Sequence, residues 1–174
     1  RHPVYHVRVP ETWRREDPPT NQSNSDTTLP IATFFVGDSI EIHIHNFPAQ
    51  TLDTRIPPGA QVGRWQRQLV TAAQSPAKTS PIAQAGYWGL YFEGTGQLKG
   101  AERTVYAWAF QLGQEQFHAL ELPGDAGAQH FFRQMRGDVT IKAVGAPEEM
   151  ASQREAIHRF ASSFQLIQEI PTRS

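Results

Sequence analysis

Cysteine is absent from the 174-residue chain. Its absence excludes a disulfide scaffold, a thiolate metal site and catalysis by a cysteine nucleophile. No apolar run approaches the roughly 18 residues that a membrane-spanning helix needs, so we expect no transmembrane segment in this chain. The formal net charge of −1 gives no electrostatic reason to expect a nucleic acid or an anionic membrane as the partner.

The motifs of common enzyme classes are also missing. The sequence holds no Gly-x-Ser-x-Gly nucleophile elbow, no phosphate-binding loop and no His-Glu-x-x-His zinc motif. Gly94, Gly96 and Gly100 have one residue too many between them for a dinucleotide fingerprint, and they lie between two predicted strands. A hairpin loop explains them better. We therefore expect no enzymatic activity and no cofactor.

The length and the distribution of polar segments predict the domain organisation. A chain of 174 residues is long enough to bury a sizeable core, and we predict a single globular domain over residues 1–174. Polar stretches with prolines predict mobile loops near residues 16–30 and 75–85. Residues 168–174 are expected to form a frayed tail.

Hydrophobic periodicity predicts the helices and strands. The clearest strand is 39–47, where isoleucines alternate with polar residues: Ile40, Ile42 and Ile44 on one face, Glu41, His43 and His45 on the other. Further strands are predicted at 5–9, 31–36, 87–93, 104–112, 117–122 and 139–144. Helices are predicted at 59–73, from about 125 to 135, and at 147–164. The strands at 87–93, 104–112 and 117–122 are expected to form a meander.

The aromatic strands indicate how these elements pack. In the strand at 87–93, Trp88 and Phe92 point to one side while Tyr87 and Tyr91 point to the other. A sheet that is apolar on both faces must be covered on both faces. We therefore predict an α+β fold, in which a central antiparallel β-sheet is sandwiched between helices in three layers.

The two ends of the chain carry a family resemblance. The first strand is followed by Pro10-Glu-Thr-Trp13, and the last helix ends in Ser163-Phe164. With the order of hairpin, helix, meander and final helix, these signatures make nearly the whole chain resemble the Mog1/PsbP/DcrB-like superfamily. Residues 125–146, predicted as a helix plus a strand, are a departure from that pattern. The resemblance implies the three-layer fold and a non-enzymatic adaptor, assembly or accessory role, and it transfers no catalytic residues.

Histidines provide the most suggestive chemistry. Alternation places His43 and His45 on one strand face, within reach of a common metal ion. If the first and third strands share a sheet, His6 approaches this pair, and Glu41 is a further ligand candidate. The simpler alternative is a polar strand face. His158, on the last predicted helix, is expected to be a boundary histidine.

We therefore predict a binding or accessory protein that presents a surface to a protein partner. The chain begins at Arg1 without an initiator methionine, which favours an exported or lipid-anchored bacterial domain whose signal sequence or anchor lies upstream. The expected location is the periplasm or cell envelope, with the cytoplasm as the alternative. Two other functions stay open: a metal-binding protein or metal-dependent hydrolase using His43 and His45, and a small-ligand carrier with a cavity beneath one helix layer.

Overall fold

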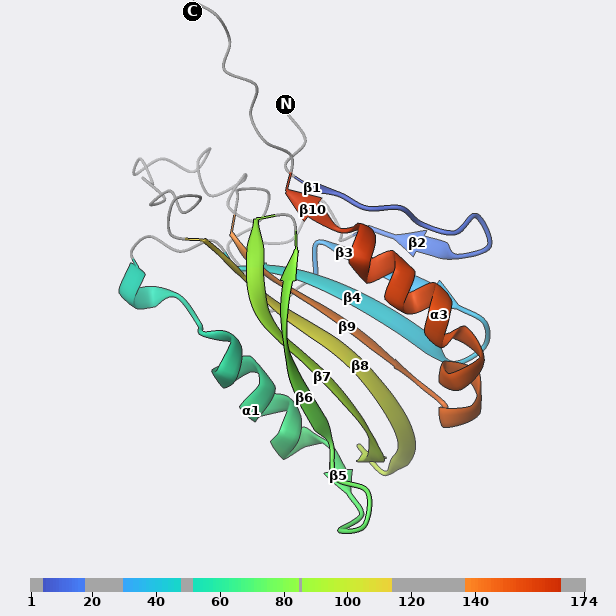
Figure 1. The fold of residues 1–174 in the computed structure, drawn as a ribbon. Helices are drawn as coiled ribbons and strands as arrows, with labels where there is room; N and C mark the ends of the chain where they lie inside the picture. The colour runs from blue at the N-terminus through green and yellow to red at the C-terminus, as the bar shows by residue number, and fades with distance from the viewer. Residues whose placement is uncertain (1–4, 18–29, 48–51, 85, 114–136, 167–174) are drawn as a thin grey trace, which may run out of the picture.

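A large antiparallel sheet organises the molecule (Figure 1). The computed structural model describes residues 5–17, 30–47, 52–84, 86–113 and 137–166. The sheet has eight strands, and β6 pairs with β7 beside β5. The strand order is β2 (Arg14–Glu16), β3 (Ala32–Val36), β4 (Ile40–Phe47), β9 (Asp138–Gly145), β8 (Ala101–Leu112), β7 (Tyr87–Leu98) and β5 (Val70–Thr71), with β6 spanning Lys78–Gln84.

Helices cover both faces of this sheet, which confirms the predicted three-layer α+β fold. The helix α3 (Pro147–Ser163) packs on one face, here called the α3 face, over isoleucines of β4 and aromatic residues of β8. The helix α1 (Pro58–Gln68) covers β7 and β8 on the opposite face, here called the α1 face, through Val62 and Trp65, together with Leu69 just after the helix. A short 3-10 helix, η1 (Leu52–Thr54), precedes it. In the described residues, no helix is long and apolar enough to cross a membrane.

The helix α3 follows its sequence signals closely. Pro147 occupies the first turn together with two acids, as expected at the positive end of a helix dipole. Its buried stripe includes Ile157 and Phe160. Trp13, from the turn after the first strand, is 8% exposed, and its ring centroid lies 5.1 Å from that of Phe160. The Pro-x-x-Trp turn therefore covers one end of the core under α3.

The carboxylate of Glu149 joins α3 to the turn between β3 and β4. It accepts hydrogen bonds from the backbone N–H groups of Ser39 (2.9 Å) and Asp38 (3.4 Å), and from the Ser39 hydroxyl (3.2 Å). The backbone hydrogen bond from Ser39 is the main cause that lowers the pKa of Glu149. Gly37 has φ +59°, and a Cβ there would lie 2.8 Å from Glu149 Oε1, so the turn suits glycine.

An ion pair buried at the opposite end of the sheet ties three segments together. Arg55 donates to both carboxylate oxygens of Asp138, from Nη2 at 2.6 Å and from Nε at 3.0 Å. Arg55 also donates to the backbone oxygen of Leu112, while Asp138 accepts from the Leu112 N–H, both at 2.9 Å. These contacts hold the start of β9, the end of β8 and the segment before α1 in one place.

Several predicted boundaries are wrong. The segment 94–103, predicted as a long hairpin connection, extends β7 and β8 to a tight turn at Lys99 and Gly100, which both have positive φ, as a type I′ turn requires. Most of the predicted loop at 75–85 forms β6. The helix predicted at 59–73 ends at Gln68, and β5 follows it.

The first strand is shorter than the predicted 5–9, and the condition that would bring His6 to the histidine pair is not met. This strand is β1 (Tyr5–His6), and it pairs with β10 (Gln165–Leu166) in a separate two-stranded sheet, not with the strand that carries His43 and His45. The strand β9 lies between β4 and β8 in the main sheet. The predicted strand at 117–122, the helix at about 125–135, most of the loop at 16–30 and the tail at 168–174 lie outside the described residues.

Candidate functional site

One half of the α1 face of the sheet is polar, and we call it the polar face. Under α1, β7 and β8 contribute apolar side chains, but β2, β3, β4 and β9 contribute charged, hydroxyl and aromatic ones on the same side. The cross-strand register aligns them in rows. The polar face consists of Arg14, Glu16, Thr33, Phe35, Glu41, His43, His45, Phe47, Thr140 and Lys142.

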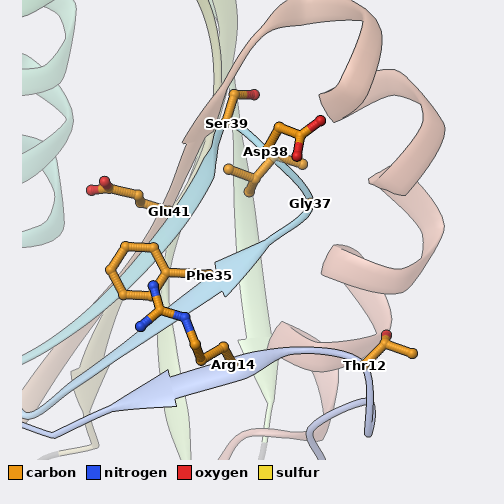
Figure 2. A pocket seen from close by; sticks show the side chains of 8 residues that line it. Thr12, Arg14, Phe35, Gly37, Asp38, Ser39 and Glu41 are labelled. Carbon is orange, nitrogen blue, oxygen red and sulfur yellow. The ribbon is translucent and has the colours of Figure 1, made fainter.

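A shallow pocket of about 420 Å³ opens beside the polar face, next to the turn between β3 and β4. Figure 2 shows Arg14, Phe35 and Glu41 projecting to one side of their strands, with the Phe35 ring between the other two. The Arg14 guanidinium carbon lies 4.2 Å from the Phe35 ring centroid, a cation–π distance. Asp38 and Glu41 also line the pocket and add negative charge. This mixture of opposite charges and an aromatic ring suits contact with another polar surface.

His43 and His45 are neighbours on the polar face, as predicted. Their ring centroids are 6.3 Å apart, and both side chains are partly exposed. The Nε2 atom of His43 lies 3.2 Å from Glu41 Oε2, and its Nδ1 atom lies 3.1 Å from Thr33 Oγ1. A metal ion would replace the proton between His43 and Glu41, and Thr33 would then accept a hydrogen bond from Nδ1.

His6 does not join this pair. The strand β1 lies on the other side of the sheet, where the Tyr5 hydroxyl donates to the Asn46 side chain at 2.6 Å. Among the residues that the structure describes, no three His, Asp or Glu side chains are grouped closely enough to hold a metal ion. Metal binding by His43 and His45 therefore stays a prediction with two histidine ligands, and with Glu41 beside one of them.

Zinc titration tests this prediction. If His43 and His45 bind a metal, the wild-type chain binds Zn²⁺ saturably in calorimetry, and the double variant H43A/H45A loses that binding while keeping its circular dichroism spectrum. The variant H6A is the matched control and should bind like the wild type. Zn²⁺ binding that is unchanged in the double variant would show that these histidines are not ligands.

Lys142 connects the polar face to α1. It lies opposite His43 in the register of β4 and β9, and its ammonium donates to Gln68 Oε1 at 3.2 Å. Burial, together with the positive charges of Arg64 and Lys99, lowers the pKa of Lys142 to about 8. Lys142 therefore begins to lose its proton, and with it its positive charge, just above neutral pH, unlike an ordinary surface lysine.

A second polar cluster lies on the α3 face, and sequence reasoning missed it. The Tyr91 hydroxyl donates to Glu93 Oε1 at 2.7 Å, and Arg154 of α3 also bonds this carboxylate oxygen. His158 Nε2 lies 2.9 Å from the Tyr91 oxygen. Because the hydroxyl hydrogen is directed to Glu93, Nε2 of His158 carries the hydrogen that Tyr91 accepts. The only sequence signal was spacing, since Tyr91 and Glu93 are two residues apart on a strand, and Arg154 and His158 are four residues apart on a helix.

The cluster shifts the titration of its members. Burial would raise the pKa of Glu93, but the hydrogen bonds from Tyr91 and Arg154 outweigh it and lower that pKa. Burial, helped by the hydrogen bond to Glu93, raises the pKa of Tyr91 well above its usual range. His158 lies 5.1–5.2 Å, centroid to centroid, from the rings of Tyr91, Tyr106 and Trp108. Burial and the charge of Arg154 lower the pKa of His158.

The lowered pKa of His158 makes stability depend on pH. The unfolded chain binds a proton at His158 near its ordinary pKa of about 6.5, whereas the folded chain binds it only at lower pH. The stabilisation is therefore complete above about pH 6.5 and is lost as the pH falls towards the folded pKa. Glu93 adds a loss only below the ordinary glutamate pKa, which separates the two effects.

Urea unfolding at a series of pH values from 5 to 8 measures this dependence. The wild type should lose stability below about pH 6.5, and H158Q should show a flatter profile over that range because glutamine does not titrate. The variant H6A is the control, since it removes a histidine from another part of the fold. A wild-type profile no steeper than that of H158Q would contradict the assignment.

The comparisons with known proteins concern the fold. No family model matches the chain, and no curated protein matches its sequence. Among solved structures, LpqN of Mycobacterium tuberculosis, described as involved in cell envelope biogenesis, superposes with a TM-score of 0.55 at 14% identity. That match covers 96% of this chain and 85% of LpqN. The cyanobacterial PsbP protein (CyanoP) of Synechocystis sp. PCC 6803 superposes with a TM-score of 0.53 at 15% identity, covering 94% of this chain and 87% of CyanoP.

The chain has a PsbP-like fold. The resemblance expected from the Pro-x-x-Trp turn and the Ser-Phe helix end is confirmed at the level of the fold, over nearly the whole chain. In this PsbP-like structure the two ends of the chain that carry those signatures pack together. Trp13 packs on Phe160 of α3, and Phe164, which follows α3, packs on Tyr5 with ring centroids 5.3 Å apart.

Proposed function

We propose that this chain is a non-enzymatic accessory domain of the bacterial cell envelope, exported or lipid-anchored, which binds a protein partner through its polar face. The observation that carries the proposal is the PsbP-like fold. One similar structure, LpqN, is described as involved in cell envelope biogenesis, and the superposition covers 96% of this chain. The other, CyanoP, is a PsbP protein.

The packing of the described residues agrees with a role in binding. One cluster of buried apolar side chains fills the space between the sheet and α3, and a second cluster fills the space between the sheet and α1. That arrangement disfavours a carrier with an enclosed cavity. The second polar cluster, on the α3 face, consists of Tyr91, Glu93, Arg154 and His158. These side chains bond one another, which explains the cluster as a fixed link between α3 and the sheet.

The polar face has the composition of a protein contact surface. Its half-buried aromatic residues, Phe35 and Phe47, lie among exposed charges of both signs such as Arg14 and Glu41. Aromatic residues and arginine are enriched where proteins bind each other. Charges of both signs favour a polar protein partner over an anionic membrane.

Site-specific crosslinking in intact cells tests the surface. A photoreactive phenylalanine analogue at Glu41, whose side chain is 53% exposed, should give a discrete adduct. The same analogue at Glu155, 88% exposed on α3, is the matched control and should give none. The variant R14E should weaken the Glu41 adduct. Equal labelling from both positions, or none from Glu41, would contradict a partner on the polar face.

The location is tested separately. We expect the natural gene, expressed in its own bacterium with its own upstream sequence, to give a product in the envelope fraction. Recovery of the product in the cytoplasm alone would refute the envelope part of the proposal.

A further inference from the structure

A second hollow, which we call the α3 groove, opens between the first turns of α3 and the strands β6, β7 and β8. Its volume is about 360 Å³, within the range of small-molecule sites. The residues that matter for its chemistry are Lys78, Glu93, Thr95, Thr104, Tyr106 and Arg154. They come from three consecutive strands and from the distant helix α3, and none of them belongs to the polar face.

The cross-strand register explains how these side chains meet. Tyr106, Glu93 and Lys78 lie opposite one another on β8, β7 and β6, and form one row on the α3 face. Thr104 and Thr95 form the next row, with their hydroxyl oxygens 2.7 Å apart. The side chain of Arg154, from α3, contacts the first row, and its guanidinium carbon lies 5.0 Å from the Tyr106 ring centroid.

The charges of the groove do not cancel. Glu93 is the carboxylate of the groove, and it already bonds Arg154 and the Tyr91 hydroxyl. Lys78 is exposed and lies in no ion pair with another described residue. One positive charge therefore remains unbalanced. The groove also includes Pro147, at the positive end of the α3 dipole, while Glu149 is directed away to the turn between β3 and β4.

Donors for an anion are present beside the two cations. Arg154 bonds Glu93 through Nη1, and a guanidinium has five N–H donors, so its other N–H groups can reach a second acceptor. In the Thr95 and Thr104 pair, one hydroxyl donates to the other, and the accepting hydroxyl keeps its own hydrogen for a ligand.

We propose that the α3 groove binds an oxyanion, the carboxylate or phosphate group of a small polar molecule, between the Lys78 ammonium and the Arg154 guanidinium. The threonine pair donates a hydrogen bond to the anion, and the Tyr106 ring contacts the guanidinium. The groove has room for more than an inorganic ion, so the anion is one end of a larger ligand. This site is independent of the partner surface proposed above.

Titration of the ¹⁵N-labelled chain with inorganic phosphate, and separately with acetate, at low ionic strength tests the site. We expect saturable shifts at Thr95, Thr104 and the Arg154 Nε resonance. Saturation by phosphate alone assigns a phosphate ester, and saturation by acetate alone assigns a carboxylate. Binding of neither anion overturns the proposal.

The variant K78A should raise the dissociation constant about two- to fivefold, the usual effect of one exposed charge. Because Lys78 is exposed, the variant should keep the wild-type spectrum elsewhere. The matched control is R159A, which removes a cation from the same helix whose guanidinium pairs with Glu155 outside the groove. An affinity unchanged in K78A would show that Lys78 does not bind the anion, and an affinity lowered equally in R159A would show that the anion responds only to overall charge. Either result overturns the proposal.

Discussion

Asp138→Ala is expected to lower the free energy of unfolding by about 3–5 kcal/mol, because it leaves a buried arginine without its counterion. The side chains of Arg55 and Asp138 are each 8% exposed. The carboxylate also accepts a hydrogen bond from the Leu112 N–H at 2.9 Å, and that donor loses its partner too. Chemical denaturation monitored by tryptophan fluorescence measures the loss.

A double variant separates the lost charge from the lost contact. Arg55→Met with Asp138→Leu removes both charges and keeps apolar volume, so it should recover part of the stability lost in Asp138→Ala. If Asp138→Ala costs less than about 1 kcal/mol, the level of an exposed ion pair, the pair is accessible to water in solution.

Phe160→Ala should cost about 3–5 kcal/mol, the usual effect of truncating a buried phenylalanine. Phe160 is 1% exposed, and its ring lies 5.1 Å from Trp13 and 5.2 Å from Phe34, centroid to centroid. Its loss opens a cavity where α3, β3 and the turn at Trp13 meet. The emission of Trp13 should therefore change together with the stability.

Phe160→Leu is the matched control. It keeps most of the apolar volume, so it should cost clearly less than Phe160→Ala. Two variants of equal stability would show that the site collapses around the smaller side chain, and that the aromatic contacts contribute little.

Local patterns predicted those parts of the fold whose own residues decide the structure. The alternation in β4 placed its isoleucines on the buried face and His43 and His45 on the polar face, because neighbouring side chains of a strand must point to opposite sides. The first-turn proline and apolar stripe of α3 likewise predicted its position to within a residue. Elements of this kind carry their own boundary signals.

Pairing between distant segments was not predictable in the same way. Pro81 indicated a loop, yet β6 contains it, because proline is tolerated in a strand at the edge of a sheet. The short β1 and β10 are strands only because each pairs with the other. In a single sequence nothing relates Tyr5 to Leu166.

The candidate sites divide along the same line. The His43 and His45 pair was visible because both residues belong to one strand. The α3 groove was not, since its charges come from β6, β7 and α3, and their approach depends on the register of the sheet. The ion pair of Arg55 and Asp138 was not predictable for the same reason, since the two residues are 83 positions apart in the sequence.

The pairing of β1 with β10 has a mechanical consequence. Tyr5 lies opposite Leu166 and His6 opposite Gln165, so the two chain ends leave from the same end of an antiparallel pair. Tension applied between the two ends therefore breaks the residue pairs of β1 and β10 one after the other and does not shear them all at once. Tyr5 then separates from Phe164, which follows α3, and from the Asn46 side chain of β4. A tether attached at one end alone puts no tension across the pair of β1 and β10.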